Sequence, residues 1–85
     1  MAWQWNFTKK SASQFKKLDK ALQKRILNKL DWWCKKEKPL DFAESLVNSE
    51  LGSYRFRVGD YRIIIDVEED IIIVLAIGHR REIYK

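Results

Sequence analysis

The chain is poor in the residues that build cross-links, chain breaks and metal sites. Its 85 residues include one cysteine (Cys34), one proline (Pro39), one histidine (His79) and three glycines. A single cysteine forms no disulfide within the chain, and Cys34 has no second ligand at metal-binding spacing, so we expect no metal or other cofactor. The acidic run at residues 68–70 is typical of a solvated turn rather than of a metal site.

The chain also lacks long apolar segments. Its longest apolar run, residues 71–77, is far shorter than the roughly 20 residues of a membrane helix and instead predicts a buried strand. No charged segment followed by an apolar one opens the chain, so the sequence shows no secretory signal. Together with the lone cysteine, these absences predict a cytoplasmic protein without a membrane partner.

The chain does have enough apolar material for one core, and its charge is unevenly distributed. Hydrophobic residues make up 46% and aromatic residues 13% of the sequence, as expected of a single packed domain over residues 1–85. Residues 1–40 carry 11 Lys or Arg against three Asp or Glu, a net charge of +8, whereas residues 41–70 carry three against eight, or −5. A basic half of this kind is the usual footprint of a nucleic-acid partner, although it also serves solubility.

The hydrophobic pattern predicts an α+β fold. Residues 2–7 alternate apolar and polar side chains, which is the period of a half-buried strand. Apolar residues spaced by three or four then predict two antiparallel helices over residues 8–18 and 20–36, with Thr8 as the first N-cap, although one bent helix fits nearly as well. A loop over residues 40–53, with room for one helical turn, follows. Three segments rich in Ile, Val and Tyr then predict a three-stranded antiparallel meander in one twisted sheet, at residues 54–58, 61–67 and 71–78.

The two-residue turn at residues 59–60 sets the register of the first two meander strands. A turn of type II′ or I′ places Arg57 directly opposite Arg62, with Arg55 on the same face. Like charges opposite each other on a sheet cost a few tenths to about 1 kcal/mol, so this pairing favours a bound anion. The planar fork of arginine suits phosphate in particular.

A different interpretation of this arginine face needs no ligand. Asp66, or an acid from the loop before Tyr54, then pairs with the arginines and forms an exposed, salt-bridged surface. Both interpretations use the same register and differ only in what supplies the negative charge.

The second turn of the meander brings the C-terminal segment beside the arginine face. Arg62 is predicted to lie opposite Ala76 or Ile77, depending on whether the loop holds three residues or two. In either case the chain leaves the sheet beside the arginine pair. We therefore expect one basic neighbourhood, with Tyr84 close by, that contains Arg57, Arg62, His79 and Arg80.

Two segments of the sequence resemble a known family. Residues 51–62 read Leu-Gly-Ser-Tyr-Arg-Phe-Arg-Val-Gly-Asp-Tyr-Arg, and residues 78–84 read Gly-His-Arg-Arg-Glu-Ile-Tyr. Their order and spacing, together with the order of strand, two helices and three strands, resemble the RelE branch of the RelE/ParE toxin superfamily over essentially the whole chain. The resemblance implies the toxin of a type II toxin–antitoxin system. Such a toxin is an mRNA interferase that enters the ribosomal A site, cuts mRNA there and is held inactive by a cognate antitoxin. Operator DNA is then a partner only through the toxin–antitoxin complex.

The resemblance also implies roles for individual residues. The positions that match the family's basic and tyrosine positions are Arg55, Arg57, Arg62, Arg80 and Tyr84. The best-known RelE members have lysines where this chain has Arg55 and Arg57. A lysine there can lose its proton and act as a base, whereas arginine cannot.

RNA cleavage without a metal uses the ribose 2′-hydroxyl as nucleophile and leaves a 2′,3′-cyclic phosphate. The protein positions the attack, neutralises charge on the phosphate and moves two protons. We expect Arg62 and Arg80 to stabilise charge, and Tyr84 to protonate the leaving oxygen or to stack on a base. His79, whose side chain has an ordinary pKa near neutrality, is the candidate general base, and the alternative for it is a solvated surface residue. We expect Arg55, Arg57 and Arg81 to contact the RNA backbone.

Two other functions stay open at this point. The ParE branch of the superfamily shares the architecture but poisons DNA gyrase. A non-catalytic module would bind RNA or DNA without cutting it. The presence of Arg62, Arg80 and Tyr84 favours RNA cleavage.

The four tryptophans divide into two groups. Trp32 falls off the apolar stripe of its helix and is expected to face a partner. Strand and helix spacing predicts burial in the core for the other three, Trp3, Trp5 and Trp33.

Overall fold

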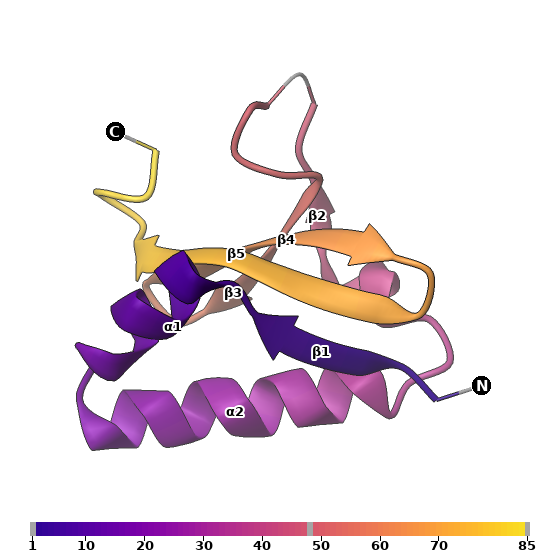
Figure 1. The fold of residues 1–85 in the computed structure, drawn as a ribbon, viewed down its shortest axis with the longest axis horizontal. Helices are drawn as coiled ribbons and strands as arrows, with labels where there is room; N and C mark the ends of the chain where they lie inside the picture. The colour runs from indigo at the N-terminus through magenta and orange to yellow at the C-terminus, as the bar shows by residue number, and fades with distance from the viewer. Residues whose placement is uncertain (1, 48, 85) are drawn as a thin grey trace.

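The computed structural model describes residues 2–47 and 49–84, which fold as one five-stranded sheet with the helices packed on one face (Figure 1). The elements in chain order are β1 (Gln4–Phe7), α1 (Lys9–Lys16), α2 (Lys20–Cys34), the 3-10 helix η1 (Pro39–Phe42), β2 (Glu44–Ser45), β3 (Tyr54–Val58), β4 (Tyr61–Glu68) and β5 (Ile71–His79). The strand order is β1-β5-β4-β3-β2. β1 runs parallel to β5, and the other neighbouring strands are antiparallel.

The α+β class and the order of strand, two helices and antiparallel meander are confirmed. The short strand β2, within the predicted loop, was not expected. It is two residues long, which is too short to produce a periodic hydrophobic pattern. The first strand begins at Gln4 rather than at residue 2.

Side-chain caps explain why the helical region forms two helices rather than one bent helix. The Thr8 hydroxyl accepts a hydrogen bond from the backbone N–H of Ser11 (3.2 Å), and the Ser11 hydroxyl accepts one from the backbone N–H of Thr8 (3.0 Å). Asp19 has extended backbone angles, and its carboxylate accepts from the N–H of Leu22 at 2.8 Å. Each helix therefore begins after a residue whose side chain satisfies one of its otherwise unpaired N–H groups.

The predicted register of the first hairpin, with Arg57 opposite Arg62, is confirmed. Gly59 has a φ of 60° and Asp60, the next residue of the turn, does not have a positive φ, so the turn is of type II′ rather than I′. A side chain at residue 59 would also lie 3.1 Å from the guanidinium of Arg25.

The predicted partner of Arg62 on β5 is wrong. The structure pairs Arg62 with Gly78 rather than with Ala76 or Ile77. The β4–β5 loop holds two residues, but a bulge shifts the register between Ile64 and Ile65, so β5 contains one extra residue before it reaches Arg62. A bulge of this kind leaves no strong signal in the spacing of apolar residues.

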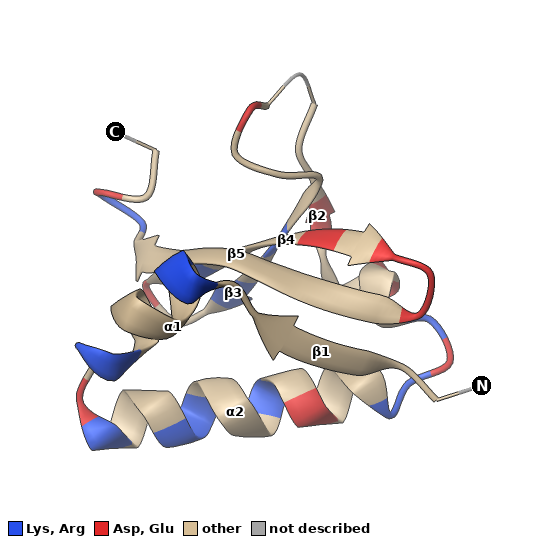
Figure 2. Ribbon diagram, in the orientation of Figure 1, with Lys and Arg blue, Asp and Glu red and all other residues tan. Residues whose placement is uncertain are grey.

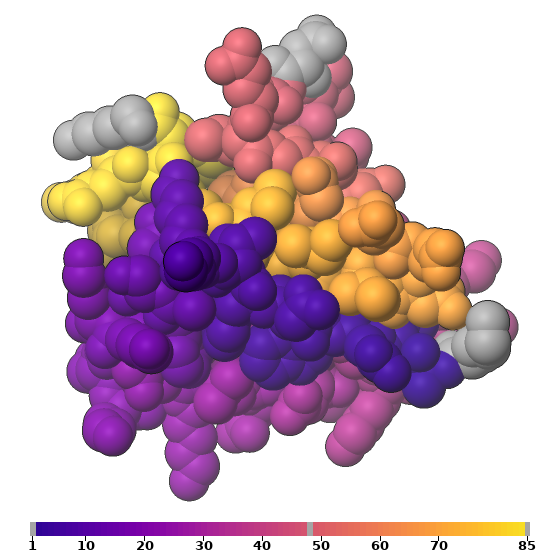
Figure 3. Space-filling model, in the orientation of Figure 1, coloured from indigo at the N-terminus to yellow at the C-terminus, as the bar shows by residue number. Residues whose placement is uncertain are grey.

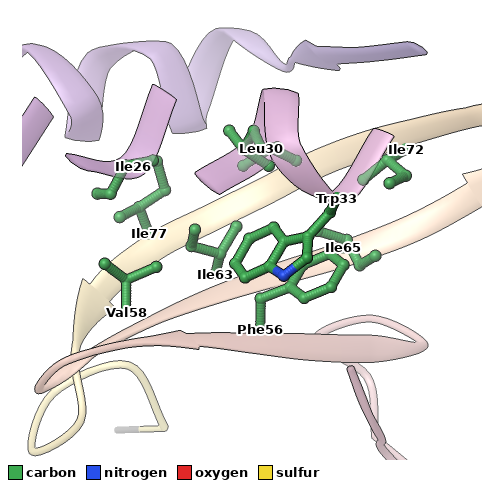
Figure 4. Close-up of a cluster of buried hydrophobic side chains, with 10 residues drawn as sticks. Ile26, Leu30, Trp33, Phe56, Val58, Ile63, Ile65, Ile72 and Ile77 are labelled. Carbon is green, nitrogen blue, oxygen red and sulfur yellow. The ribbon is translucent and has the colours of Figure 1, made fainter. Parts of the chain in front are cut away.

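The core lies between α2 and the sheet (Figure 4). The α2 residues Ile26, Leu30 and Trp33 recur at helix spacing and are almost fully buried. The Trp33 ring stacks on Phe56 of β3 with centroids 3.8 Å apart and planes 10° apart. The predicted burial is thus confirmed for Trp33, while Trp3 and Trp5 pack, partly buried, against the edge of the same cluster.

The opposite face of the sheet is partly covered by the segment between β2 and β3. A Cβ at Gly52 would lie 2.7 Å from the Ile64 side chain and 3.1 Å from the Ile65 carbonyl oxygen, so only glycine allows this approach. Ile64 is fully buried as a result. Residues 49–51 and 80–84 project from the body of the molecule, away from α2 (Figures 1 and 3).

Over residues 2–47 and 49–84, no helix is both long enough and apolar enough to cross a membrane. The same residues contain no group of three or more His, Cys, Asp or Glu side chains placed to hold a metal ion.

The second hairpin turn contains a strained residue whose relief should stabilise the domain. Glu69 has a φ of 55°, and this left-handed conformation costs an L-residue about 1–2 kcal/mol. Glycine removes that strain, but it loses more conformational entropy on folding, which offsets about 0.5–1 kcal/mol of the stabilisation. We therefore expect Glu69→Gly to raise the free energy of unfolding by about 0.5 kcal/mol, measured by urea denaturation. The matched change Glu68→Gly, within β4, should lower it by about 0.5–1 kcal/mol. An unchanged or reduced stability of Glu69→Gly would contradict this account.

Candidate nucleic-acid interface

The arginines of β3 lie on the face of the sheet that α2 does not cover, and an acid of the chain pairs with them. Glu44 of β2 lies opposite Arg55 in the strand pairing. Its Oε2 accepts hydrogen bonds from Nη2 (2.6 Å) and Nε (3.2 Å) of Arg55, and its Oε1 lies 3.5 Å from Nε of Arg57. Of the two sources of negative charge considered from the sequence, the segment before Tyr54 is confirmed.

Asp66, the other acid considered from the sequence, has a different role. Its Oδ1 accepts hydrogen bonds from the hydroxyl (2.6 Å) and the backbone N–H (2.9 Å) of Ser53. Asp66 therefore anchors the start of β3 and is not part of an ion pair with the arginines.

The arginines hold the Glu44 carboxylate in its charged form. The hydrogen bond from Arg55 is the main cause of a lowered pKa for Glu44, and the charges of Arg55, Arg57 and Arg62 add to it, while desolvation acts in the opposite direction. Glu44 is therefore ionised at neutral pH, and its pairing with Arg55 is lost only when the pH falls through that lowered pKa.

Tyr84 joins this group through Arg55. Nη1 of Arg55 donates a hydrogen bond to the Tyr84 hydroxyl at 2.6 Å, and the guanidinium carbon lies 5.6 Å from the centroid of the Tyr84 ring. The segment after β5 is thereby folded back towards β3, although Tyr84 itself stays 45% exposed. Glu44, Arg55, Arg57 and Tyr84 together form what we call the β3 cluster.

Arg62 lies opposite Arg57 but is held differently. It is 93% buried, and its Nη1 donates to the carbonyl oxygens of Gly59 and Tyr61, both at 3.0 Å. Two carbonyl acceptors therefore offset the proximity of the two like charges. They also orient Arg62 towards the turn of its own hairpin.

His79 and Arg80 lie at the end of β5, beside the first hairpin turn. His79 pairs with Tyr61, and the two rings meet edge to face with centroids 5.5 Å apart. Cross-strand partners share a face of the sheet, so His79 lies on the face that carries α2, whereas the β3 cluster lies on the other. Arg80 donates its backbone N–H to Asp60 (2.8 Å), and its Nε lies 3.8 Å from the Asp60 carboxylate. Arg81 is exposed, and its N–H donates to Nδ1 of His79 (3.2 Å).

The structure thus divides six of the seven predicted site residues into two groups. Arg55, Arg57 and Tyr84 come together in the β3 cluster, and His79, Arg80 and Arg81 lie around the first hairpin turn. The seventh, Arg62, pairs with Arg57 but is buried and bound to carbonyl oxygens of its own hairpin. Sequence reasoning missed Glu44 as a member of the cluster. Its pairing depends on a two-residue strand that periodicity does not detect, and the available signal was only the general expectation of an acid from that loop.

A comparison with family sequence models decides the relationship of the chain. The model described as ParE toxin of type II toxin-antitoxin system, parDE, matches residues 6–84. The chain belongs to this family. It is therefore a type II toxin of the RelE/ParE superfamily, as the resemblance of residues 51–62 and 78–84 predicted. A comparison with curated proteins gives no significant match.

Solved structures of toxin–antitoxin complexes share the fold of this ParE-family toxin. A chain of the RelB–RelE antitoxin–toxin complex from Methanococcus jannaschii is 28% identical over 93% of this chain and 94% of its own, with a TM-score of 0.74. A chain of the RelE–RelB complex from Pyrococcus horikoshii is 26% identical over 96% and 99%, with a TM-score of 0.75. A chain of the toxin–antitoxin complex RelBE2 from Mycobacterium tuberculosis has the same fold, with a TM-score of 0.81 at 18% identity over 94% and 100%.

Removal of the Arg55 charge should raise the pKa of Glu44. In Arg55→Gln the main cause of the lowered pKa is gone, so we expect the Glu44 pKa to rise towards its ordinary value. Arg81→Gln removes the same charge away from Glu44 and should leave that pKa unchanged. Side-chain carboxyl NMR shifts followed over a pH titration measure both. An equal Glu44 pKa in wild type and Arg55→Gln would contradict the assigned pairing.

Proposed function

We propose that this toxin is a metal-independent endoribonuclease that cuts mRNA in the ribosomal A site. The observation that carries the proposal is the β3 cluster, in which a carboxylate, two arginines and a tyrosine hydroxyl converge on one exposed face. These groups match the requirements of attack by a ribose 2′-hydroxyl. The reaction needs a proton acceptor, stabilisation of charge on the phosphate, and a group that donates a proton or stacks on a nucleobase. Such a toxin acts where ribosomes are, in the cytoplasm.

The two arginines of the cluster are suited to different tasks. Arg55 uses three nitrogens on Glu44 and Tyr84, so it acts chiefly by holding them in place. Arg57 has one contact in the ion pair with Glu44, at 3.5 Å, and its side chain is 63% exposed. Most of its donors therefore face solvent, which makes Arg57 the group that first binds an RNA phosphate.

We assign to Arg80 and Arg62 the stabilisation of the negative charge that builds up on the reacting phosphate. Arg80 is half exposed and has only a long contact to Asp60, so it can turn towards a bound strand. Arg62 acts from within the sheet through its charge, which already reaches Glu44. Arg81, exposed beside His79, extends the basic surface along the RNA backbone.

We assign proton removal to Glu44 rather than to His79. Glu44 lies among the arginines and is ionised at neutral pH, so it can accept the proton of a 2′-hydroxyl placed beside Arg57. His79 is directed to the other face of the sheet by its pairing with Tyr61. Tyr84, held by Arg55, then stacks on a base or protonates the leaving oxygen.

Cleavage should depend on the hydroxyl of Tyr84. We expect the wild-type toxin, incubated with translating ribosomes, to give mRNA fragments ending in 2′,3′-cyclic phosphate. Tyr84→Phe should reduce the rate about 10²-fold or more, because phenylalanine has no hydroxyl to donate a proton to the leaving oxygen. Tyr54→Phe removes a hydroxyl from a tyrosine packed against the core and should leave the rate unchanged. Binding of mRNA without any cleavage by the wild type would favour the non-catalytic module instead.

The two candidate bases can be separated directly. Glu44→Gln should lower the cleavage rate about 10²- to 10⁴-fold, whereas His79→Gln should cleave at the wild-type rate. In the wild type the rate should fall as the pH drops through the lowered pKa of Glu44, because the protonated carboxyl accepts no proton, and Glu44→Gln should lose this acid limb. A fully active Glu44→Gln paired with an inactive His79→Gln would transfer the role to His79.

A gyrase poison is the second candidate function, and the match to the ParE family model favours it. The two functions give opposite results in cells that express the toxin. A gyrase poison leaves mRNA intact and induces DNA damage, whereas the proposed nuclease arrests translation with cut mRNA. Mapping of mRNA ends beside a DNA-damage reporter, in the same culture, distinguishes them.

A further inference from the structure

The segment after β5 turns back on the strand at once, and its last part is uncharged. The backbone N–H groups of Glu82 and Ile83 both donate to the carbonyl oxygen of His79, at 2.8 and 2.9 Å. Residues 80–82 are charged, whereas residues 83–84 are not (Figure 2). One isolated turn has little stability of its own, so the position of its end depends on contacts with the rest of the domain.

Ile83 contacts the domain at a glycine. A Cβ at Gly78 would lie 3.0 Å from Cδ1 and 3.5 Å from Cβ of Ile83, so the isoleucine occupies the space that a side chain at residue 78 would fill. Gly78 does not have a positive φ, and an L-residue could therefore adopt its backbone conformation. What glycine supplies at this position is room for Ile83. We call the contact between these two residues the Ile83 seat.

The Ile83 seat lies on the same face of the sheet as the β3 cluster. Gly78 pairs with Arg62 of β4, and cross-strand partners share a face. Arg62 in turn pairs with Arg57 of the β3 cluster. Ile83 therefore packs on the face that carries the arginines, although it comes from the segment after the last strand.

Tyr84, the next residue, has few other contacts that could place it. Its hydroxyl accepts a hydrogen bond from Nη1 of Arg55 at 2.6 Å, but the residue is 45% exposed. Unlike Tyr54 and Tyr61, it does not pack against the core cluster of the described residues. A single exposed hydrogen bond contributes little net free energy and does not by itself order a chain end. The tyrosine thus depends on Arg55 at its hydroxyl and on the Ile83 seat at its backbone.

We propose that Ile83 is a positioning residue: by packing on Gly78, it holds Tyr84 where the hydroxyl reaches Arg55. The placement of Tyr84 stands on the contacts above, and only its effect on RNA cleavage rests on the proposed function. Cleavage is sensitive to such placement, because a shift of about 1 Å in a reacting group can cost about 10²-fold in rate. Ile83 acts through Tyr84 and does not have to touch the RNA itself.

A purely structural role fits Ile83 less well. The residue is half-buried and, over residues 2–47 and 49–84, lies outside the hydrophobic core cluster. It also lines a hollow of about 280 Å³ beside α1, together with Lys10, Gln14 and Leu51, so its packing is incomplete. Truncation of Ile83 therefore removes little packing from the domain, and the loss of Tyr84 placement is the main expected effect.

The first test measures the placement of Tyr84 without RNA. The chain has three tyrosines, so a ¹³C label on the ring carbon that bears the hydroxyl gives three NMR signals, which Tyr→Phe variants assign. In Ile83→Ala the Tyr84 signal should move towards its position in the urea-unfolded toxin, while the other two signals stay. Gly78→Val should have the same effect by displacing Ile83, although valine is favoured in strands.

Two control variants belong to this NMR test. Ile83→Leu keeps the volume of the side chain and should keep the wild-type Tyr84 signal. Leu51→Ala removes an aliphatic side chain from the same hollow but not from the Ile83 seat, and should also leave the signal unchanged. Circular dichroism and the urea midpoint check that each variant is folded.

The second test measures cleavage of mRNA on translating ribosomes. Ile83→Ala should lower kcat about 10- to 100-fold with little change in KM, because the proton from Tyr84 is needed in the transition state. The double variant Ile83→Ala/Tyr84→Phe should be no slower than Tyr84→Phe alone, since a residue that acts only through the hydroxyl adds nothing once the hydroxyl is gone. Ile83→Leu should restore most of the rate.

Other outcomes would overturn the proposal. An unchanged Tyr84 signal in both Ile83→Ala and Gly78→Val, with both variants folded, would leave Arg55 alone to place the tyrosine. A double variant much slower than Tyr84→Phe would give Ile83 a role of its own. Failure of the proposed function has a different signature, because in a wild-type toxin that leaves mRNA intact the Tyr84 signal still responds to Ile83→Ala.

Discussion

The packing of one stripe of α2 against one face of the sheet is the constraint on which the rest of this domain depends. Ile26, Leu30 and Trp33 lie against Phe56 and its neighbours, and the Trp33–Phe56 stack joins the end of the helix to β3. A chain of 85 residues has little apolar area to spare, so this face has to be almost wholly apolar. Strand alternation then assigns every second side chain of β3 to the opposite face, where charges do not disturb the core.

On that opposite face, charge is balanced by pairing within the chain. Arg62 is held by two carbonyl oxygens of its own hairpin, and Glu44 lies between the two arginines of β3. The anion that the arginine register favours is thus present in the free protein. A phosphate that approaches this face competes with Glu44 for Arg57, whose contact is long, more readily than for Arg55, whose hydrogen bonds are short.

The predictable and unpredictable parts of the structure differ in the range of the interactions that determine them. The register of Arg57 against Arg62 followed from the sequence because a two-residue turn with glycine is a local constraint. The partner of Arg62 on β5 did not, because a bulge five residues from the turn at Gly59 changes the count without changing the apolar pattern. Glu44 was missed for a related reason. Its two-residue strand exists only because β3 offers an edge to pair with, which is a tertiary effect.

The pairing of β1 with β5 has a consequence for the time at which the toxin becomes complete. Gln4 pairs with Ile71, 67 positions later, so the first strand stays without its partner until β5 has been synthesised. Tyr84 follows β5, and its contact with Arg55 forms later still. Until β5 and Tyr84 have been synthesised, therefore, neither the complete sheet nor the complete β3 cluster can exist on the nascent chain. The order of the strands delays assembly of this surface until the ribosome that makes the toxin has passed the codons for its last strand.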